Sequence, residues 1–273
     1  MKSSKTVRAL VESAMMIALA TVLSIFKMID LPYGGSVTFA SMLPMIILAY
    51  RHGTLWGLGS GLTYAAIQQL LGLNTLSYVT GWQSVVAVIL LDYVAAFTIV
   101  GFGGIFRKSS KSQRGALIWG ASLASALRYV CHVISGATVW AGLSIPSSAA
   151  LIYSVGYNAT YMIPETIILV AVTYYLGGII DFSRPVPTRT SSGQLTQRES
   201  PLRLLSGAIF LLGGVIDVWL IAPTLQDEES GKFIFEGLIN ANWMAVAIVS
   251  VITATFGVAL LLIAKRSKQK PQQ

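Results

Sequence analysis

The chain has 273 residues, of which 54% are hydrophobic and only 11% are charged, with a formal net charge of +8. A soluble domain carries about a quarter charged residues, so a water-soluble enzyme or binding domain is excluded. The single cysteine, Cys131, excludes an intrachain disulfide framework, and no Cys/His cluster has the spacing of a zinc site. We therefore expect an all-α integral membrane protein.

Apolar stretches that approach the roughly 20 residues needed to cross a bilayer recur along the chain. Each predicts a helix, because backbone polar groups in lipid must pair within the segment and no alternating barrel pattern is present. The second stretch is short and predicts a helix that is tilted, partly interfacial or shielded by neighbours, and the sixth is interrupted at Pro164. The predicted spans are Ala9–Met28, Ser36–Tyr50, Thr54–Leu71, Trp82–Phe106, Ala116–Val139, Ala149–Ile180, Leu205–Ile221 and Trp243–Ala264.

The basic residues predict the topology, because cytoplasmic loops are enriched in Lys and Arg. Glu12 interrupts the first apolar stretch and no convincing cleavage site follows, so we expect a retained helix rather than a signal peptide. With both termini cytoplasmic, all of the 19 Lys and Arg lie inside except Lys27, Arg128 and Lys232. The positive charge then reflects topology and contact with anionic membrane lipid, and nucleic acid is not expected as a partner.

One change in composition divides the chain. Phe182–Pro201 is rich in Ser, Thr, Pro and Arg, which is typical of a linker. We expect a six-span membrane core at residues 1–181, a cytoplasmic linker at 182–202 and a two-span C-terminal extension at 203–273. No internal repeat is evident, which argues against a secondary transporter built from inverted repeats.

Ionisable side chains inside membrane spans are costly and mark candidate functional positions. Counted at 1.5 Å per residue, Asp92, Arg128, His132 and Asn158 lie roughly 10–16 Å below the external ends of their helices. Glu165 is a further candidate in the sixth span. Two interpretations remain open: the layer forms a small-ligand pocket, or Asp92 and Arg128 form a structural ion pair and His132 an interhelical hydrogen bond.

The aromatic residues near this layer have two possible roles as well. They could line a pocket, or those near the external face could belong to the interfacial aromatic belt. Glu12 and Asp217, which are near span ends or isolated, are weaker candidates. The aromatic residues concerned are Tyr93, Tyr129, Trp140, Tyr153 and Tyr157.

Catalytic and nucleotide-binding motifs are missing from the sequence, which has no P-loop, HExxH or GxSxG pattern. We therefore expect neither catalytic residues nor a metal or cofactor. Cys131 and His132 are adjacent on a helix and point about 100° apart, which is poor geometry for Cys–His catalysis. Ala14 and Ala18 form a small-residue face on the first helix, suited either to a partner helix or to internal packing.

Three stretches carry a resemblance to a known family. They are LLDY at Leu90–Tyr93, RYVCHVISGATVW at Arg128–Trp140 and YSVGYN at Tyr153–Asn158. Over roughly Val7–Ile180 the sequence resembles the substrate-binding S-components of energy-coupling factor (ECF) vitamin transporters, and is most similar to the thiamin-specific branch. The resemblance implies a six-helix bundle, here with two additional C-terminal transmembrane helices, in a bacterial cytoplasmic membrane.

The resemblance also implies a site and partners. The ligand would be thiamin, in an outward-opening pocket, and Arg128 would orient the carboxylate of Asp92. Ala14 and Ala18 would contact a transmembrane coupling subunit, which acts with two cytoplasmic ATPase subunits. The implied pocket residues are Asp92, Tyr93, His132, Trp140, Tyr153 and Asn158.

Two positions depart from the family pattern. Asp92 stands where a Glu is expected, and Gly35 stands where the family has a ligand-stacking Trp, with Tyr33 as a candidate replacement. These departures leave open an S-component for another small vitamin or precursor, such as hydroxymethyl-pyrimidine. The alternatives of a different class are an intramembrane enzyme that uses Asp92 or the Cys131–His132 pair, and a membrane scaffold without a ligand.

Overall fold

The computed structural model describes residues 2–31, 34–110, 112–140, 148–190, 201–221, 224 and 235–266. Contacts divide the chain into two compact units, Met1–Thr188 and Arg189–Gln273, each described here by itself. Among the described residues, five helical segments are long and apolar enough to cross a membrane. They are Lys5–Ile25, Trp82–Arg107, Gln113–Thr138, Ser148–Ile179 and Trp243–Leu260.

The first helix is followed by a short hairpin that the sequence did not predict. Helix α1 (Lys2–Ile25) leads into strand β1 (Lys27–Asp30), which pairs antiparallel with β2 (Ser36–Thr38). Lys27 lies opposite Thr38 and Asp30 opposite Ser36, with an irregularity between them. The predicted span Ser36–Tyr50 is therefore wrong in its first part, because residues 36–38 pair with the preceding strand β1 instead of starting a helix.

Helix α2 (Leu43–His52) has only ten residues and is enclosed by protein. Every residue from Leu43 to Tyr50 is buried, as expected for an apolar helix too short to span a bilayer. Only Gly53 separates α2 from α3 (Thr54–Leu71), and its φ of +99° is a conformation that favours glycine. The chain thus reverses direction at Gly53, and α2 packs against α3. The bounds of α3 are those predicted from the sequence.

The fourth predicted span is helical throughout but not uniformly α-helical. After the 3₁₀ turn Leu73–Tyr78 it comprises α4 (Trp82–Val88), a π-helical stretch (Ile89–Ala95), α5 (Ala96–Thr98) and a 3₁₀ stretch (Ile99–Arg107). The last of these packs against α2, α3 and α6. π-Helical turns occur frequently at functional sites, and this one contains Asp92 and Tyr93.

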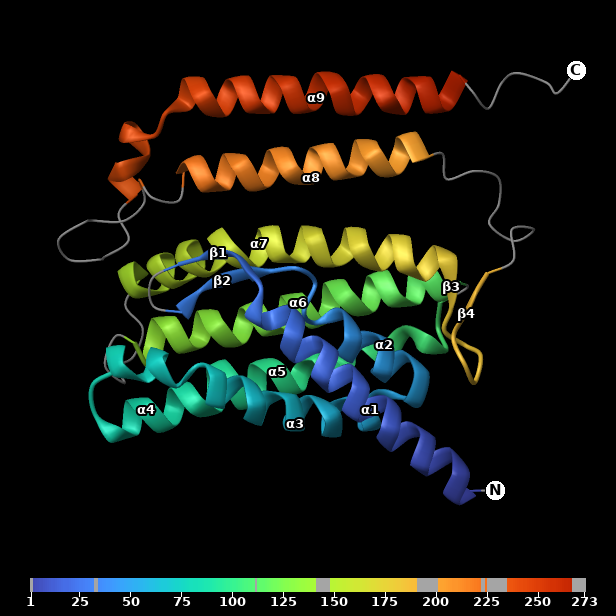
Figure 1. The fold of residues 1–273 in the computed structure, drawn as a ribbon. Coiled ribbons are helices and arrows are strands. Elements are labelled where there is room, and N and C mark those ends of the chain that lie inside the picture. The colour runs from blue at the N-terminus through green and yellow to red at the C-terminus, as the bar shows by residue number, and fades with distance from the viewer. Residues whose placement is uncertain are drawn as a thin grey trace, which may run out of the picture. The chain divides into compact units, whose positions relative to one another are not determined.

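Two long helices form the other side of this unit. Helix α6 (Gln113–Thr138) packs along α7 (Ser148–Ile179), as Figure 1 shows. A Cβ atom on Gly120 would lie 2.0 Å from the carbonyl oxygen of Gly103, so glycine is what allows α6 to approach the 3₁₀ stretch. The predicted interruption at Pro164 is absent: α7 continues through it, and Pro164 is buried.

The remaining elements are a two-residue ladder and a helical pair. Strands β3 (Ile180–Asp181) and β4 (Thr188–Arg189) pair after α7. In the second unit, α8 (Pro201–Ile221) packs against α9 (Trp243–Arg266), which follows the 3₁₀ turn Phe235–Asn240. The Ser206 hydroxyl donates to the Gly257 carbonyl at 2.8 Å. Many large apolar side chains of α9 are exposed, which suits a lipid-facing helix.

Candidate ligand-binding site

The Asp92 carboxylate is the centre of a hydrogen-bonded cluster between the fourth segment and α6. Its Oδ1 lies 2.7 Å from His132 Nδ1. Its Oδ2 accepts from the Ser135 hydroxyl at 2.6 Å and from the Trp140 indole N–H at 3.2 Å. Three of the predicted site residues, Asp92, His132 and Trp140, thus meet directly, and Ser135 joins them although it was not predicted. Its spacing of three residues from His132 places both on one face of α6.

His132 has one ring nitrogen in use and one without a partner. Nδ1 faces Asp92, whereas Nε2 is buried and has no hydrogen-bond partner among the described residues. The imidazole also packs edge-on against the ring of Tyr161, with centroids 6.2 Å apart. A buried polar atom without a partner is rare in a native structure and requires an explanation. Occupation by a ligand is one such explanation.

Asn158 is buried on α7 and bonds mainly to the protein itself. Its side-chain N–H groups donate to the carbonyls of Ser154 at 2.8 Å and of His132 at 3.3 Å. Its Oδ1 accepts from the Tyr161 hydroxyl at 2.5 Å. An amide oxygen can accept two hydrogen bonds, so one lone pair remains available. Through these hydrogen bonds Asn158 positions the backbone of His132 and the hydroxyl of Tyr161. Tyr161 was not among the predicted site residues.

Arg128 does not pair with Asp92, contrary to one of the two interpretations of the sequence. Its Nη1 lies 3.1 Å from Glu165 Oε2 on α7, and its guanidinium lies over the Phe97 ring at 4.5 Å. The Thr38 hydroxyl of β2 donates to the other Glu165 oxygen. The predicted depths were similar, but depth along a helix axis does not specify which neighbour a side chain faces. Arg128 lies one turn before His132 on α6, opposite Glu165.

The tyrosines of α7 form an aromatic ladder beside the Asp92 cluster. The rings of Tyr153 and Tyr157 stack with an interplanar angle of 1°, and Tyr161 follows at an edge to Tyr157. Tyr93 behaves differently: its hydroxyl donates to the Gly72 carbonyl and its ring stacks on Phe97. Tyr93 is therefore outside the Asp92 hydrogen-bond cluster, although it was predicted to belong to the site.

Gly35 lies directly on this ladder. Its N–H donates to the Tyr157 hydroxyl at 3.3 Å, and a Cβ atom at this position would lie 2.8 Å from the Tyr161 ring. The space that a larger side chain would need at residue 35 is therefore occupied by the α7 tyrosines. Tyr33, the candidate replacement, lies outside the described residues.

The first helix presents two different faces. Ala14 and Ala18 are both exposed, whereas Ser13, Ile17 and Ala20 are buried against the unit. The Ser13 hydroxyl accepts a hydrogen bond from the Trp56 indole N–H at 2.7 Å. Internal packing therefore involves the neighbouring small residues, and it leaves the Ala14–Ala18 face open.

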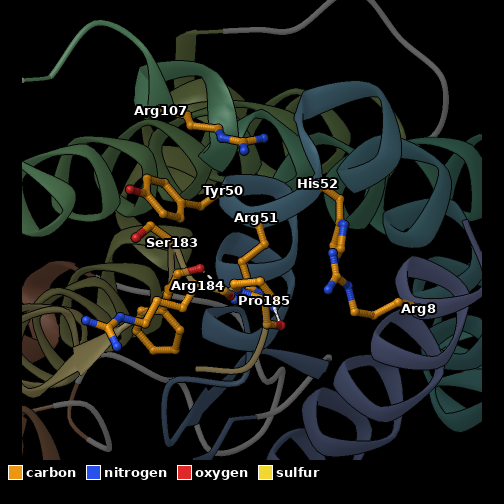
Figure 2. A pocket seen from close by; sticks show the side chains of 9 residues that line it. Arg8, Tyr50, Arg51, His52, Arg107, Ser183, Arg184 and Pro185 are labelled. Atoms are coloured by element: carbon orange, nitrogen blue, oxygen red, sulfur yellow. Dashed lines mark hydrogen bonds between the residues drawn. The ribbon is translucent and has the colours of Figure 1, made fainter. Parts of the chain in front are cut away.

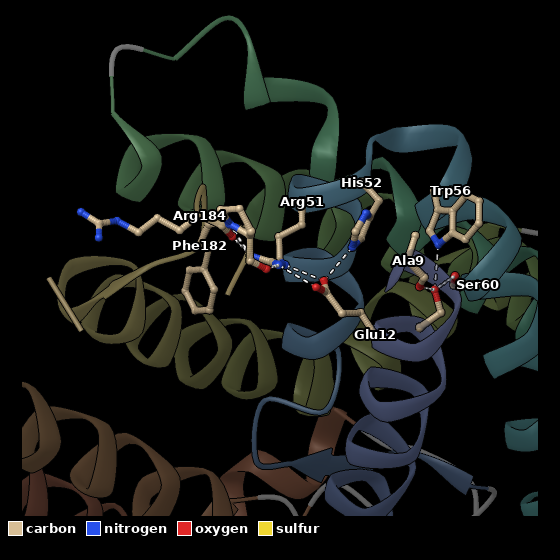
Figure 3. A network of polar contacts seen from close by, with 10 residues as sticks. Ala9, Glu12, Arg51, His52, Trp56, Ser60, Phe182 and Arg184 are labelled. Carbon is tan, nitrogen blue, oxygen red and sulfur yellow. Dashed lines mark hydrogen bonds and ion pairs between the residues drawn. The ribbon is translucent and has the colours of Figure 1, made fainter. Parts of the chain in front are cut away.

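Glu12, a weaker candidate in the sequence, is the centre of a second polar network (Figure 3). Both of its oxygens bond to Arg51, each at 2.8 Å, and His52 Nε2 lies 2.7 Å from one of them. Arg51 also donates to the backbone carbonyls of Phe182, Arg184 and Pro185. Glu12 is therefore neither isolated nor at the predicted ligand site, and the start of the predicted linker is docked on α2.

Membrane-spanning helices around a partly buried carboxylate–imidazole cluster and an aromatic wall define an integral membrane protein with a candidate small-ligand site. The model of the family described as Thiamine transporter protein (Thia_YuaJ) matches residues 10–180. The chain belongs to this thiamine transporter family, and its function is thiamine transport. The intramembrane enzyme and the S-component for a different vitamin are not favoured.

One curated relative agrees with this assignment, and one solved structure agrees with the fold. The chain is 37% identical over 179 residues to the thiamine transporter ThiT of Bacillus subtilis strain 168, covering 62% of this chain and 89% of that protein. It is similar in fold to the solved structure of ThiT from Listeria monocytogenes, with a TM-score of 0.51 and 21% identity over 63% of this chain and 94% of that one. The second comparison supports the fold alone.

Proposed function

We propose that the chain binds thiamine between the fourth segment, α6 and α7, as the S-component of an ECF-type uptake system. The observation that carries this proposal is the buried, unpartnered His132 Nε2 beside the Asp92 carboxylate. Leaving such an atom unsatisfied costs about 1–3 kcal/mol, and a polar ligand atom would remove that cost. The aromatic ladder on α7 supplies the apolar wall that a ring-containing ligand requires.

The chemistry of thiamine matches these groups. Its thiazolium ring is a cation, and its aminopyrimidine offers hydrogen-bond donors and acceptors at one edge. Trp140 and Tyr153 would stack on the rings and attract the cation through their π faces. Asp92 and His132 would hydrogen-bond the aminopyrimidine, with Asn158 holding His132 in place.

Two further predicted site residues take supporting roles in this proposal. Arg128, together with Glu165, supports the site from one helical turn away. Tyr93 stabilises the π-helical stretch through its contacts with Gly72 and Phe97. This stabilisation would position the neighbouring Asp92.

The transport cycle would depend on partner proteins. The chain contains no P-loop, so ATP-driven movement would come from a transmembrane coupling subunit and two cytoplasmic ATPases. The exposed Ala14–Ala18 face of α1 is the proposed docking surface for the coupling subunit, since two alanines four residues apart permit close helix approach. In this arrangement both termini are cytoplasmic, residues 1–181 bind the ligand, 182–202 connect and 203–273 form an extension.

The experiment that tests the function combines identification and titration of the ligand. Mass spectrometry of small molecules released from the purified full chain is expected to detect thiamine. Titration calorimetry is expected to give one site for thiamine and much weaker binding of hydroxymethyl-pyrimidine, which lacks the cationic ring. Equal affinity for the two would contradict the role of the aromatic wall. Absence of binding to either would contradict the proposed site.

A further inference from the structure

A pocket lies at the end of the helices where α1 begins and α2 ends, away from the Asp92 cluster (Figure 2). Its volume is about 180 Å³, and its walls come from α1, α2, the end of the 3₁₀ stretch and the residues after β3. None of the described residues that line it is acidic, and five are basic. The basic residues are Arg8, Arg51, His52, Arg107 and Arg184.

The charges of this pocket are only partly balanced by the surrounding protein. Arg51 is paired with Glu12, and Arg184 with Asp181 at 2.9 Å. Arg8 and Arg107 are exposed and have no ion pair or hydrogen bond to any described residue. Two guanidinium groups from different elements therefore face one pocket without a counter-charge, which favours an anionic ligand.

The surface beside the pocket is apolar. On α1, Val7, Leu10 and Val11 are 55%, 57% and 54% exposed. Next to Arg107, Ile105 is 49% exposed. These exposed apolar side chains belong to candidate membrane-spanning segments, where lipid acyl chains can cover them. A ligand with an anionic head group and apolar tails would match both the basic pocket and the apolar surface beside it. A free anion would match only the basic pocket.

We propose that this pocket binds the phosphate group of an anionic phospholipid, held by Arg8 and Arg107. Guanidinium groups recognise phosphate oxygens through paired, charge-assisted hydrogen bonds, and basic pockets between membrane helices bind phospholipid head groups. The acyl chains lie along Val7, Leu10 and Val11, in the first turns of the α1 face whose later turns carry Ala14 and Ala18. Arg51, which is held by Glu12 and by backbone carbonyl groups, lines the same pocket. This inference does not rest on the thiamine site.

Native mass spectrometry of the detergent-solubilised full chain tests the proposal, with phosphatidylglycerol and phosphatidylcholine as probes. The wild-type protein is expected to bind one phosphatidylglycerol more tightly than phosphatidylcholine. Arg8→Gln combined with Arg107→Gln is expected to weaken phosphatidylglycerol binding roughly tenfold or more, because charged hydrogen bonds are lost. The matched control is Lys5→Gln with Lys108→Gln, which removes the same charge from α1 and from the residue that follows the 3₁₀ stretch, both outside the pocket.

The control is expected to bind phosphatidylglycerol as the wild-type protein does, and thiamine affinity should be unchanged in both variants. The proposal would be overturned if the arginine variant bound phosphatidylglycerol as tightly as the wild-type protein. It would also be overturned if the lysine control lost as much phosphatidylglycerol affinity as the arginine variant. Displacement of phosphatidylglycerol by inorganic phosphate at comparable concentration would assign the site to a free anion instead. If the double variant does not fold, Arg107→Gln alone, which leaves α1 unchanged, is expected to lower the affinity for phosphatidylglycerol several-fold. An affinity equal to that of the wild-type protein would then refute the proposed lipid site.

Discussion

Asp92 and His132 come from different membrane segments, and their side chains meet at 2.7 Å. A carboxylate at Nδ1 favours the tautomer that carries its proton on that nitrogen. Nε2 is then left as a hydrogen-bond acceptor. The proposed ligand would therefore meet His132 as an acceptor, which suits the amino group of a pyrimidine.

The first prediction concerns this pair. Asp92→Asn is expected to weaken thiamine binding by roughly 10- to 100-fold, because hydrogen bonds to a charged group contribute about 1.5–3 kcal/mol. His132→Ala and Asn158→Ala should also weaken it. Titration calorimetry measures the affinity, and Asp30→Asn, at an exposed carboxylate on β1, is the control. Wild-type affinity in all three site variants would exclude the site.

The second prediction concerns the indole of Trp140, which donates to Asp92 at 3.2 Å. Trp140→Phe removes one hydrogen bond and should cost about 0.5–1.5 kcal/mol of binding energy, and Trp140→Ala should cost more because the stacking face is lost as well. Thiamine should quench the tryptophan fluorescence of the wild-type protein. Quenching and affinity that both survive in Trp140→Phe would make this residue part of the interfacial belt.

The third prediction concerns the close contact between Gly35 and α7. Gly35→Ala places a Cβ 2.8 Å from the Tyr161 ring, and such overpacking typically costs about 1–3 kcal/mol. We expect a lower unfolding temperature and weaker thiamine binding. Gly59→Ala is the matched control, because a Cβ there meets nothing within 4 Å and alanine favours the helix. A Gly35→Ala protein as stable as the Gly59→Ala protein would contradict this packing.

The fourth prediction separates binding from transport. Ala14→Trp or Ala18→Trp should abolish thiamine uptake by cells while the purified protein still binds thiamine normally, because the indole holds the partner helix away. Ala247→Trp, at an exposed alanine of α9, is the control and should leave uptake unchanged. Loss of binding together with uptake would instead indicate that the face packs internally, and uptake at the normal rate would contradict docking there.

Much of the fold could be predicted because length and hydropathy decide which segments enter a membrane. The bounds of α3 agree at both ends, whereas Ser36–Thr38 was mistaken for the start of a helix. The error arose because residues 36–38 pair with residues 27–30, and the hydropathy of residues 36–50 does not report that pairing. The short α2 is stabilised by burial, which no local signal reports.

The site was harder to predict than the fold. Helix geometry predicted similar depths for Asp92, Arg128 and His132 along their helices, but it could not predict the direction in which each side chain points. The partner of Arg128 is Glu165, because that residue faces it across the α6–α7 interface. The π-helical stretch around Asp92 changes the angular position of every residue after it, and hydropathy carries no trace of it.

The contacts of the Arg51 guanidinium set the minimum length of a binding unit cut from this chain. It holds α1 through Glu12 and, at the same time, donates to the carbonyls of Phe182, Arg184 and Pro185. A protein truncated after residue 181 would leave those donors without acceptors, next to the helix that carries Ala14 and Ala18. A minimal thiamine-binding protein made from this chain should therefore extend through Pro185, and trimming from the other end should stop before Glu12.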